Sequence, residues 1–294
     1  MYRSGFVALI GRPNVGKSTL LNALVEEKVA IISDRPQTTR NQIRAVLTRP
    51  DFQIIFIDTP GLHKPKHMLG TTMVQTARTT MQEVDLVCFL VEVNEVPGAG
   101  DRYIAEILKT VSSPIFLILN KIDLISAEKL ASNSELYQKL SPFKAHFALS
   151  ALKKTDLEPF IQAALAEMDE GPQYYPPDMV TDQPERFIAS EIIREKIIVL
   201  TRQEIPFSIA VVIEEMKPRD KGDLLDIRAE IFVERKSQVG IIVGKGGLLL
   251  KEIGSKARQE LEALFGQHIF LDMRVKVKRD WRNREEDLRR LGYR

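Results

Sequence analysis

The sequence predicts two domains of different class: an α/β domain with a mostly parallel six-stranded sheet and helices on both faces, followed by a smaller α+β domain. The first half of the 294-residue chain alternates apolar runs of strand length with helical patterns. Such alternation is typical of a parallel sheet that is covered on both sides. A stretch rich in proline interrupts it at residues 171–181, and closely spaced prolines cannot continue a helix or a central strand. The order of elements after this stretch is different.

The first domain, residues 1–170, is expected to contain five nearly continuous apolar strands and one hairpin strand. Residues 49–51 form a turn signal between Gln42–Thr48 and the run that begins at Phe52, so this strand is expected to be antiparallel. The apolar strands are expected at Phe6–Ile10, Gln53–Ile57, Leu86–Val91, Ile115–Leu119 and Ala145–Leu149. The helices are expected at Ser18–Val25, Thr71–Glu83, Asp101–Val111, Ala127–Leu140 and Leu157–Met168.

The second domain, residues 182–294, is expected to follow the linker with the order α-β-β-α-α-β. Its first helix is predicted at Thr181–Leu200, and its two hairpin strands at Ser208–Lys217 and Leu224–Glu234, with a turn around Lys221, Gly222 and Asp223. The remaining elements are expected to be helices at Ser237–Val243 and Leu248–Phe265 and a strand at Ile269–Lys278.

Composition excludes several classes of protein. The chain carries 42 basic and 40 acidic residues, so its net charge of +2 indicates no particular partner. The single cysteine, Cys88, cannot form an internal disulfide, which fits a reducing cytosol, and its apolar surroundings predict burial. The four histidines lack the spacing of a zinc site. Since no run of 18 apolar residues occurs, we expect a cytoplasmic protein.

A phosphate-binding loop is predicted at residues 11–18, which match G-x-x-x-x-G-K-S between a strand and a helix. The glycines let backbone N–H groups point at phosphate oxygens, and the helix N-terminus adds positive potential. Lys17 is expected to reach the β- and γ-phosphates and Ser18 to bind Mg²⁺. The alternative is a plain glycine turn. The predicted nucleotide-binding residues are Gly11, Arg12, Pro13, Asn14, Val15, Gly16, Lys17, Ser18 and Thr19.

Two further segments are expected to complete the magnesium and γ-phosphate site. Asp58 ends a predicted strand, where its carboxylate is placed to hold Mg²⁺ through water, and Gly61 offers a backbone N–H to the γ-phosphate. Thr39, or Thr38 as second choice, supplies a hydroxyl to Mg²⁺ from the segment Pro36–Arg40. The alternatives are a simple turn and a polar surface loop. The residues assigned after the strand are Asp58, Thr59, Pro60, Gly61 and Leu62.

The sequence after the strand Ile115–Leu119 predicts that the base is guanine. Asp123 accepts two adjacent hydrogen bonds, which guanine offers from N1 and N2 and adenine does not. The stem of Lys121 is expected to lie over the base, and Asn120 to tether loops. Ser150 and Ala151 are expected to supply a backbone N–H for guanine O6. The predicted residues are Asn120, Lys121, Ile122, Asp123, Ser150 and Ala151.

These five segments resemble the G motifs of the P-loop GTPases, within the branch that contains the Era family. The resemblance implies GTP and GDP as ligands, Mg²⁺ as cofactor and catalytic roles for Lys17, Asn14, Thr39 and Gly61. Signalling GTPases have a water-orienting glutamine where this chain has Leu62, which predicts slow turnover that a partner or ion accelerates. Asn14 resembles the asparagine that holds K⁺ in some members of the branch.

The loop Gly244-Lys245-Gly246-Gly247 lies between two predicted helices and matches the G-x-x-G loop of KH domains. By itself such a loop is more often a helix–helix turn. Basic residues surround it, among them Lys236 and Lys251, and Arg274–Arg279 alternates basic and apolar positions, so that one face of the last strand is expected to be cationic. The expected ligand is single-stranded RNA. The alternative is a solvated charged face. The predicted RNA-binding residues are Lys236, Gly244, Lys245, Gly246, Gly247 and Lys251.

A P-loop GTPase domain followed by an α+β domain that looks like a type II KH domain resembles the Era family over essentially the whole chain. The resemblance implies an assembly factor of the small (30S) ribosomal subunit that binds 16S rRNA near its 3′ end. We expect a monomer without a DNA partner. The resemblance also implies a peripheral fraction at the inner membrane. The alternatives are a membrane-peripheral signalling GTPase whose second domain docks anionic lipid, and a scaffold that does not hydrolyse GTP.

Overall fold

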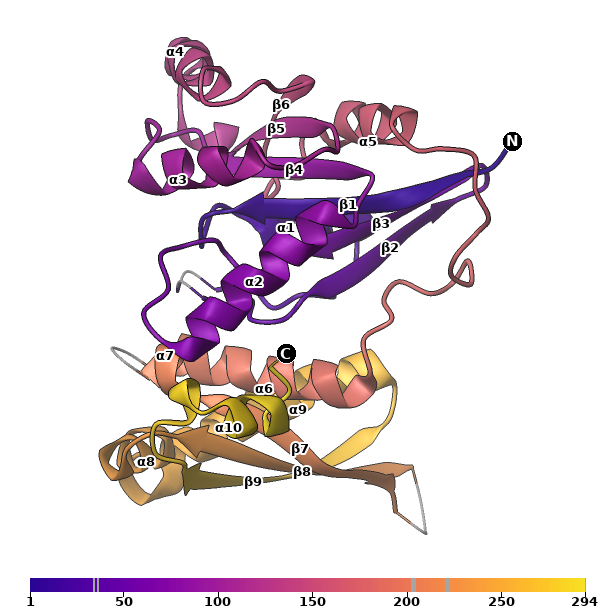
Figure 1. Cartoon of the computed structure of the whole chain (residues 1–294). Coiled ribbons are helices and arrows are strands. Elements are labelled where there is room, and N and C mark those ends of the chain that lie inside the picture. Colours follow the sequence, from indigo (N-terminus) through magenta and orange to yellow (C-terminus); the bar gives the residue numbers. More distant parts are fainter. Residues whose placement is uncertain (34, 36, 202–204, 220–222, 294) are drawn as a thin grey trace. The chain divides into compact units, whose positions relative to one another are not determined.

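The computed structural model describes residues 1–33, 35, 37–201, 205–219 and 223–293. Its contacts divide the chain into two compact units (Figure 1). Unit 1 comprises Met1–Ile32, Thr39–Lys66 and Gly70–Asp182, and unit 2 comprises Ser33–Thr38, His67–Leu69 and Gln183–Arg294. Two parts of the sequence predictions, Pro36 and the turn at Lys221 and Gly222, lie outside the described residues.

Unit 1 is built on a six-stranded sheet with the order β2-β3-β1-β4-β5-β6. All neighbouring strands are parallel except β2 and β3, which form the predicted antiparallel hairpin. The six-stranded, mostly parallel sheet is therefore confirmed. The strands are β1 (Arg3–Gly11), β2 (Ile43–Arg49), β3 (Phe52–Asp58), β4 (Leu86–Glu92), β5 (Ile115–Asn120) and β6 (Ala145–Leu149).

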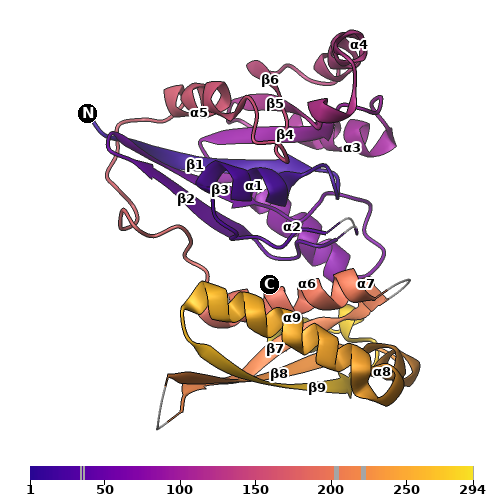
Figure 2. The same cartoon turned by 180° about the vertical axis from the view of Figure 1, so that it is seen from behind.

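Helices cover both faces of this sheet, because successive strand residues point to opposite sides and both sides are apolar. On one face Ala77 of α2 and Ile104 of α3 join a core with Phe89. On the other, Phe160 of α5 packs against Phe56 and Phe147. Figure 1 shows α2 in front of the sheet. Figure 2, seen from behind, shows α1 in front of the opposite face. The helices are α1 (Lys17–Val25), α2 (Met68–Gln82), α3 (Ala99–Leu108), α4 (Ala127–Gln138), α5 (Leu157–Ala166) and the 3₁₀ turn η1 (Ile122–Leu124).

The proline-rich segment lies along the open edge of this sheet. Gln53 Oε1 accepts the backbone N–H groups of Tyr174 and Tyr175, each at 2.9 Å. Val46 of the edge strand β2 donates its N–H to the carbonyl of Val180 at 2.8 Å. Since an edge strand leaves every second backbone group unpaired, these contacts give part of that edge a partner.

Unit 2 follows the predicted order α-β-β-α-α-β in a three-stranded sheet, β7-β8-β9. Strands β7 and β8 are antiparallel with an irregularity between Ile213 and Glu215, and β8 and β9 are parallel. The first helix begins four residues later than Thr181, because Pro184 occupies its N-cap. The predicted elements are α6 (Glu185–Leu200), β7 (Ala210–Pro218), β8 (Leu224–Val233), α8 (Lys236–Val243), α9 (Leu248–Phe265) and β9 (His268–Val277).

The sequence did not predict the short elements of unit 2, which are α7 (Ile205–Ser208), η2 (Lys245–Gly247), η3 (Trp281–Asn283) and α10 (Glu285–Arg290). None of the helices formed by the described residues has the length and apolar character that a membrane crossing requires. Cys88 is buried in β4, as predicted, and burial raises the pKa of its thiol.

The expectation that one face of β9 is cationic is wrong, because β9 itself and the neighbouring strand β8 both supply acids. Arg274 Nη2 lies 3.4 Å from Asp272 Oδ2, and Lys276 pairs with Glu230 of β8, which stands opposite Arg274 in the parallel register. Further ion pairs on these strands join Lys217 to Glu215, Arg228 to Glu215 and Asp272, and Arg219 to Asp226. This face of the sheet is consequently a lattice of paired charges.

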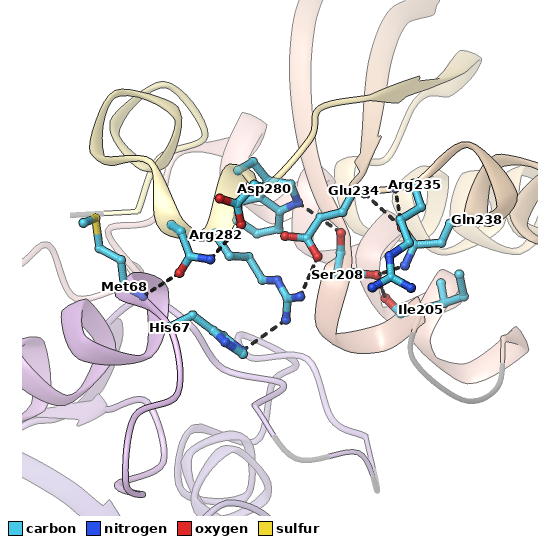
Figure 3. Close-up of polar contacts among 11 residues, drawn as sticks. His67, Met68, Ile205, Ser208, Glu234, Arg235, Gln238, Asp280 and Arg282 are labelled. Carbon is cyan, nitrogen blue, oxygen red and sulfur yellow. Dashed lines mark hydrogen bonds and ion pairs between the residues drawn. The ribbon is translucent and has the colours of Figure 1, made fainter.

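A polar cluster in unit 2 fixes the start of α8 (Figure 3). The buried Gln238 accepts the backbone N–H groups of Glu234 and Arg235, both at 2.9 Å, and donates to Ser208 Oγ at 2.8 Å. Trp281 donates its indole N–H to the carbonyl of Ser208 at 3.1 Å. Because the G-x-x-G loop follows the other end of α8, the cluster anchors the helix that presents this loop.

Arg282 extends the same cluster toward a short segment that also belongs to unit 2. Its Nη2 lies 2.5 Å from Glu234 Oε2, and its Nη1 lies 3.1 Å from His67 Nε2. Next to it, Asn283 accepts the backbone N–H of Met68 at 3.3 Å. Figure 3 shows the side chain of Arg282 between His67 and Glu234.

Candidate functional site

The predicted phosphate-binding loop, residues 11–18, joins the end of β1 to the start of α1, and its two glycines are sterically required. Gly16 has φ 100°, and a Cβ there would lie 2.2 Å from Asn120 Nδ2. A Cβ on Gly11 would lie 2.5 Å from the carbonyl oxygen of Leu90. These distances are too short for any side chain. The loop is therefore packed so closely against β4 and β5 that only glycine fits.

Lys17, the first residue of α1, turns its ammonium group back into this loop. Nζ donates to the carbonyl of Arg12 at 3.0 Å and to that of Gly11 at 3.3 Å, and the residue is only 6% exposed. Burial lowers the pKa of Lys17, while the negative charge of Asp58 acts in the opposite direction. A buried cation without a full counter-charge favours the binding of an anion.

Ser18, Thr39 and Asp58 converge beside Lys17. Asp58 Oδ2 accepts from Ser18 Oγ at 2.6 Å and from Thr39 Oγ1 at 3.1 Å, and the two hydroxyls lie 2.9 Å apart. The other carboxylate oxygen, Oδ1, is buried without a hydrogen-bond partner among the described residues. Burial raises the pKa of Asp58, opposed by Lys17 and the two hydroxyls. Thr38, in contrast, donates its hydroxyl to the carbonyl of Arg35 at 2.6 Å.

This cluster fits Mg²⁺, which prefers hard oxygen ligands and is usually held by one or two protein groups together with phosphate. In the part of the chain that the structure describes, no group of three or more His, Cys, Asp or Glu side chains could hold a metal. The hydroxyls of Ser18 and Thr39 would hold the ion directly, and the carboxylate of Asp58 would hold it through water, next to a bound phosphate.

The D-x-x-G segment after β3 lies directly against the phosphate loop. A Cβ on Gly61 would stand 2.7 Å from the backbone nitrogen of Pro13, and the N–H of Leu62 donates to the carbonyl of Gly11 at 3.0 Å. Thr59 Oγ1 donates to the carbonyl of Leu9 at 2.8 Å. The side chain of Leu62 is 1% exposed and belongs to the core. Where signalling GTPases have the water-orienting glutamine, this chain therefore has a leucine that faces away from solvent.

Asn120 tethers two loops, as the sequence predicts. Its Nδ2 donates to the carbonyl of Val15 at 2.8 Å, and its Oδ1 accepts the N–H of Ala151 at 3.0 Å. The N–H of Ser150 donates to the carbonyl of Thr155 at 3.4 Å. Both amides that were expected to serve guanine O6 therefore have protein acceptors in this structure, and their contact with the base stays a prediction. Asn120 Oδ1 reaches Ala151 because β5 and β6 lie side by side.

Two contacts that the sequence did not reveal orient the predicted base-reading residues. Ser150 Oγ donates to Asp123 Oδ1 at 2.5 Å, which fixes one oxygen of the carboxylate. Lys121 has φ 68°, and its Nζ lies 2.8 Å from Glu92 Oε1 at the end of β4. Glu92 stands opposite Asn120 in the parallel register. Only the pairing of β4 with β5 brings this carboxylate to Lys121.

The remaining loop residues differ in exposure and direction. Asn14 is exposed and adopts φ 68°, a conformation that asparagine tolerates well. Arg12 points away from the loop, with its Nε 2.8 Å from Asp101 Oδ1. Val15 is fully buried, and Thr19 is half-buried in the first turn of α1.

The G-x-x-G loop of unit 2 also requires its glycines. Gly244, Gly246 and Gly247 have φ of 72°, 59° and 81°, values in the left-handed region that L-residues rarely adopt. Lys245 is exposed between them, and the other two predicted RNA contacts, Lys236 and Lys251, are exposed as well. The structure thus brings the predicted lysines to the surface around α8, η2 and the start of α9.

A groove of about 530 Å³ opens beside this loop, between α9 and β9. Gly254 lies against the Met273 side chain at its wall, where a Cβ would stand 2.8 Å from Met273 Cε. Phe270 is 53% exposed on β9, with the guanidinium of Arg219 5.2 Å from its ring centre. The sequence pattern did not single out these groove residues. The groove is lined by Gly247, Leu250, Lys251, Gly254, Ser255, Arg258, Ile269, Phe270, Leu271 and Met273.

Comparison with known proteins agrees with both halves of the site. Residues 6–121 match the family model described as 50S ribosome-binding GTPase, and residues 204–282 match that of the KH domain. The GTPase Era of Alkaliphilus metalliredigens is 51% identical over 292 residues, which cover 99% of each chain. The chain belongs to the Era family of GTPases. Era of Heliobacterium modesticaldum is likewise 51% identical over 291 residues, covering 99% of this chain and 97% of that protein.

Two solved Era structures share the whole fold. Era in complex with MgGDPNP and nucleotides 1506–1542 of 16S ribosomal RNA has a TM-score of 0.97 at 42% identity, covering 100% of this chain and 99% of that one. An alanine variant of Aquifex aeolicus Era bound to GDP and AlF4⁻ has a TM-score of 0.95 at 41% identity, covering 99% of each chain. This Era-family chain is accordingly a GTPase with a C-terminal KH domain.

Proposed function

We propose that this GTPase is an assembly factor of the small ribosomal subunit that binds single-stranded 16S rRNA near its 3′ end and uses GTP as a conformational switch. The observation that carries the proposal is the convergence of Ser18, Thr39 and Asp58 beside Lys17, in a chain whose G-x-x-G loop borders an open groove. An Era protein that binds Mg²⁺, a GTP analogue and the 3′ segment of 16S rRNA has the same fold.

In the proposed nucleotide complex, Lys17 and the backbone N–H groups of residues 11–18 bind the β- and γ-phosphates, and Asp123 binds the guanine edge. The N–H of Gly61 would serve the γ-phosphate. Ser18 and Thr39 and, through water, Asp58 would hold Mg²⁺, which would neutralise charge on the phosphates. Because Thr39 comes from a segment between α1 and β2, its position beside Ser18 depends on how that segment is ordered. A γ-phosphate would favour the ordered state.

Hydrolysis is proposed to be slow without a further activator, since Leu62 is buried and has no polar group to orient water. Asn14 is the candidate ligand for K⁺, which would supply positive charge near the β- and γ-phosphates, where charge develops in the transition state. Its exposure at the mouth of the loop supports this role. Turnover measured in KCl and in NaCl at equal ionic strength tests it. Equal rates would remove Asn14 from the mechanism.

The proposed RNA site combines the glycine loop, at which the sugar-phosphate chain can approach the backbone, with the groove between α9 and β9. A KH fold clamps about four nucleotides of a single strand. Lys245 and Lys251 supply positive charge for the phosphates, and the exposed ring of Phe270 offers a surface on which a base can stack. The charged side chains of β7, β8 and β9 pair with one another. The groove, with Lys251 and Arg258 in its lining, is therefore the cationic region beside the sheet.

Filter binding with a single-stranded RNA of the 16S 3′ sequence tests the RNA proposal. Lys245→Asp and Gly246→Asp are expected to abolish binding while GTP hydrolysis persists. Lys256→Asp is the matched control, because Lys256 lies on α9, which borders the groove, but pairs with Glu252 at 2.9 Å and does not line the groove. Loss of RNA binding in the control alone would contradict the proposal.

The same proteins in a liposome sedimentation assay test the alternative of a lipid-docking GTPase. Lipid binding requires charge but no glycine loop, so Gly246→Asp would weaken it no more than Lys256→Asp does. Cytoplasmic location, a monomeric state and the boundaries 1–170, 171–181 and 182–294 also belong to the proposal, as does the peripheral contact with the inner membrane that the family resemblance implies. The boundaries rest on the proline-rich stretch.

A further inference from the structure

Asp101, in the first turn of α3 and outside the five G motifs, binds the side chain of a residue of the phosphate-binding loop. Arg12 reaches from that loop to Asp101, where its Nε donates to Oδ1 at 2.8 Å. Its Nη2 lies 3.4 Å from Glu95 Oε2. The side chain of Asp101 is completely buried and that of Arg12 is 27% exposed. A buried carboxylate needs a partner of opposite charge, and here the partner comes from the nucleotide site.

Asp101 uses its second oxygen on its own helix. Oδ2 accepts the N–H of Gly98, the N-cap of α3, at 2.9 Å. Gly100 leaves room for the arginine, because a Cβ there would lie 2.7 Å from Arg12 Cδ. Both oxygens of Asp101 therefore have defined partners, and the side chain of Arg12 lies across the first turn of the helix.

The backbone of Arg12 takes part in the orientation of Lys17. Its carbonyl accepts from Lys17 Nζ at 3.0 Å, the shorter of the two contacts that this ammonium makes with loop carbonyls. Lys17 is almost completely buried, so a shift of this carbonyl would leave the ammonium group poorly compensated. The anchored side chain of Arg12 restrains that shift.

We infer that Asp101 is a positioning residue for the nucleotide site: it anchors Arg12, and through the backbone of Arg12 it holds the phosphate-binding loop and Lys17 in their binding arrangement. The inference rests on the nucleotide site proposed above. The guanidinium of Arg12 is engaged by Asp101 and Glu95, so it acts as an anchor and makes no contact with phosphate. GDP and GTP both use the loop, so loss of the anchor weakens binding of both by the same factor.

The test uses the full-length variants Arg12→Gln and Asp101→Asn and their combination. Release of a fluorescent GDP analogue and kcat and KM for GTP are measured on each. Each single variant is expected to release the analogue about tenfold faster, the usual order for loss of an outer-shell partner. The double variant is expected to match the singles, because both remove the same interaction. KM should rise in parallel.

The matched control is Arg49→Gln combined with Glu158→Gln. This arginine–carboxylate pair is likewise in unit 1 and is formed by two hydrogen bonds of 2.7 Å. In the sheet, Arg49 of β2 stands opposite Phe52 of β3, and Phe52 stands opposite Arg3, the first residue of β1. The phosphate-binding loop follows the last residue of β1, at the other end of that strand. The control is expected to release the analogue at the wild-type rate, and the melting temperature of every variant shows whether it is folded.

Faster release in Arg12→Gln but not in Asp101→Asn would show that Arg12 contacts the nucleotide, and would overturn the inference. Wild-type release rates in both variants, or a lower kcat at unchanged KM, would also overturn it. Where Arg12→Gln does not fold, Arg12→Lys keeps the charge but loses the planar fork, and the same increase in release is required of it. Failure of the wild-type protein to bind the analogue would instead refute the proposed nucleotide site.

Discussion

Asn120 donates a hydrogen bond to the carbonyl of Val15 across 105 residues of sequence. The same side chain accepts the N–H of Ala151, so one amide joins the phosphate loop, β5 and the loop after β6. Gly16 leaves just enough space for the Asn120 side chain, since a Cβ at residue 16 would collide with Asn120 Nδ2. The phosphate end and the base end of the site are thus held together by a single buried residue.

Replacement of this residue by Asn120→Ala is expected to weaken GDP binding by about tenfold or more, because each buried group left without a partner costs about 1–3 kcal/mol. Isothermal titration calorimetry of GDP measures the effect. An affinity equal to that of the wild type would show that the two loops hold their positions without the tether.

Glu92→Gln is expected to accelerate GDP release, because the contact between Glu92 and Lys121 Nζ at 2.8 Å loses its charge. Both side chains are partly exposed, so the expected factor is modest, about two- to fivefold, as for an ion pair worth up to about 1 kcal/mol. Stopped-flow release in low and high salt checks it. The difference between variant and wild type should shrink as the salt concentration rises.

Asp123→Asn is expected to reverse the preference for the base. The neutral amide no longer accepts two hydrogen bonds from guanine N1 and N2, but its NH₂ group can donate to the 2-oxo group of xanthine. Affinity for GDP should fall by more than about a hundredfold and affinity for XDP should rise. Competition between the two nucleotides gives the answer directly. A variant that still prefers GDP would remove Asp123 from base recognition.

Thr39→Ala is expected to reduce magnesium-dependent GTP hydrolysis by about tenfold or more while GDP affinity stays near wild type, because its hydroxyl lies beside Ser18 and Asp58. Thr38→Ala is the comparison, since the hydroxyl of Thr38 donates to Arg35 instead. Hydrolysis measured over a range of Mg²⁺ concentrations separates the two. A larger loss in Thr38→Ala would reverse the assignment.

Gln238→Ala is expected to destabilise unit 2 by about 1–3 kcal/mol, because it removes the acceptor of the N–H groups of Glu234 and Arg235. Denaturant unfolding of the full chain measures this loss. Gln162→Ala is the control: Gln162 is exposed on α5 and donates to the exposed side chain of Glu158, so its replacement should change the free energy of unfolding little. Equal effects would contradict the role of the cluster around α8.

The elements of both units were predictable where sequence periodicity is strong. The strands of unit 1 were predicted to within a few residues, because apolar runs such as Leu86–Val91 are buried on both faces. The helix end predicted at Val111 lies three residues past the end of α3 at Leu108. Short elements such as α10 escaped prediction, since six residues show no periodicity.

The nucleotide motifs were visible because their residues are contiguous, whereas their supporting partners are not. Asp101 and Glu92 have no local signature, and only the packing of α3 and β4 brings them to Arg12 and Lys121. The charge of β9 was misjudged for the same reason. The acid that pairs with Lys276 is Glu230, on a strand 46 residues earlier in the chain.

The hydrogen bond from Val46 to Val180 has a practical consequence for anyone who dissects the protein. A fragment that stops at residue 170 would leave the outer side of β2 uncovered, and bare strand edges pair readily with other chains. Such a fragment should self-associate, whereas one that continues through Asp182 would carry its own edge cover.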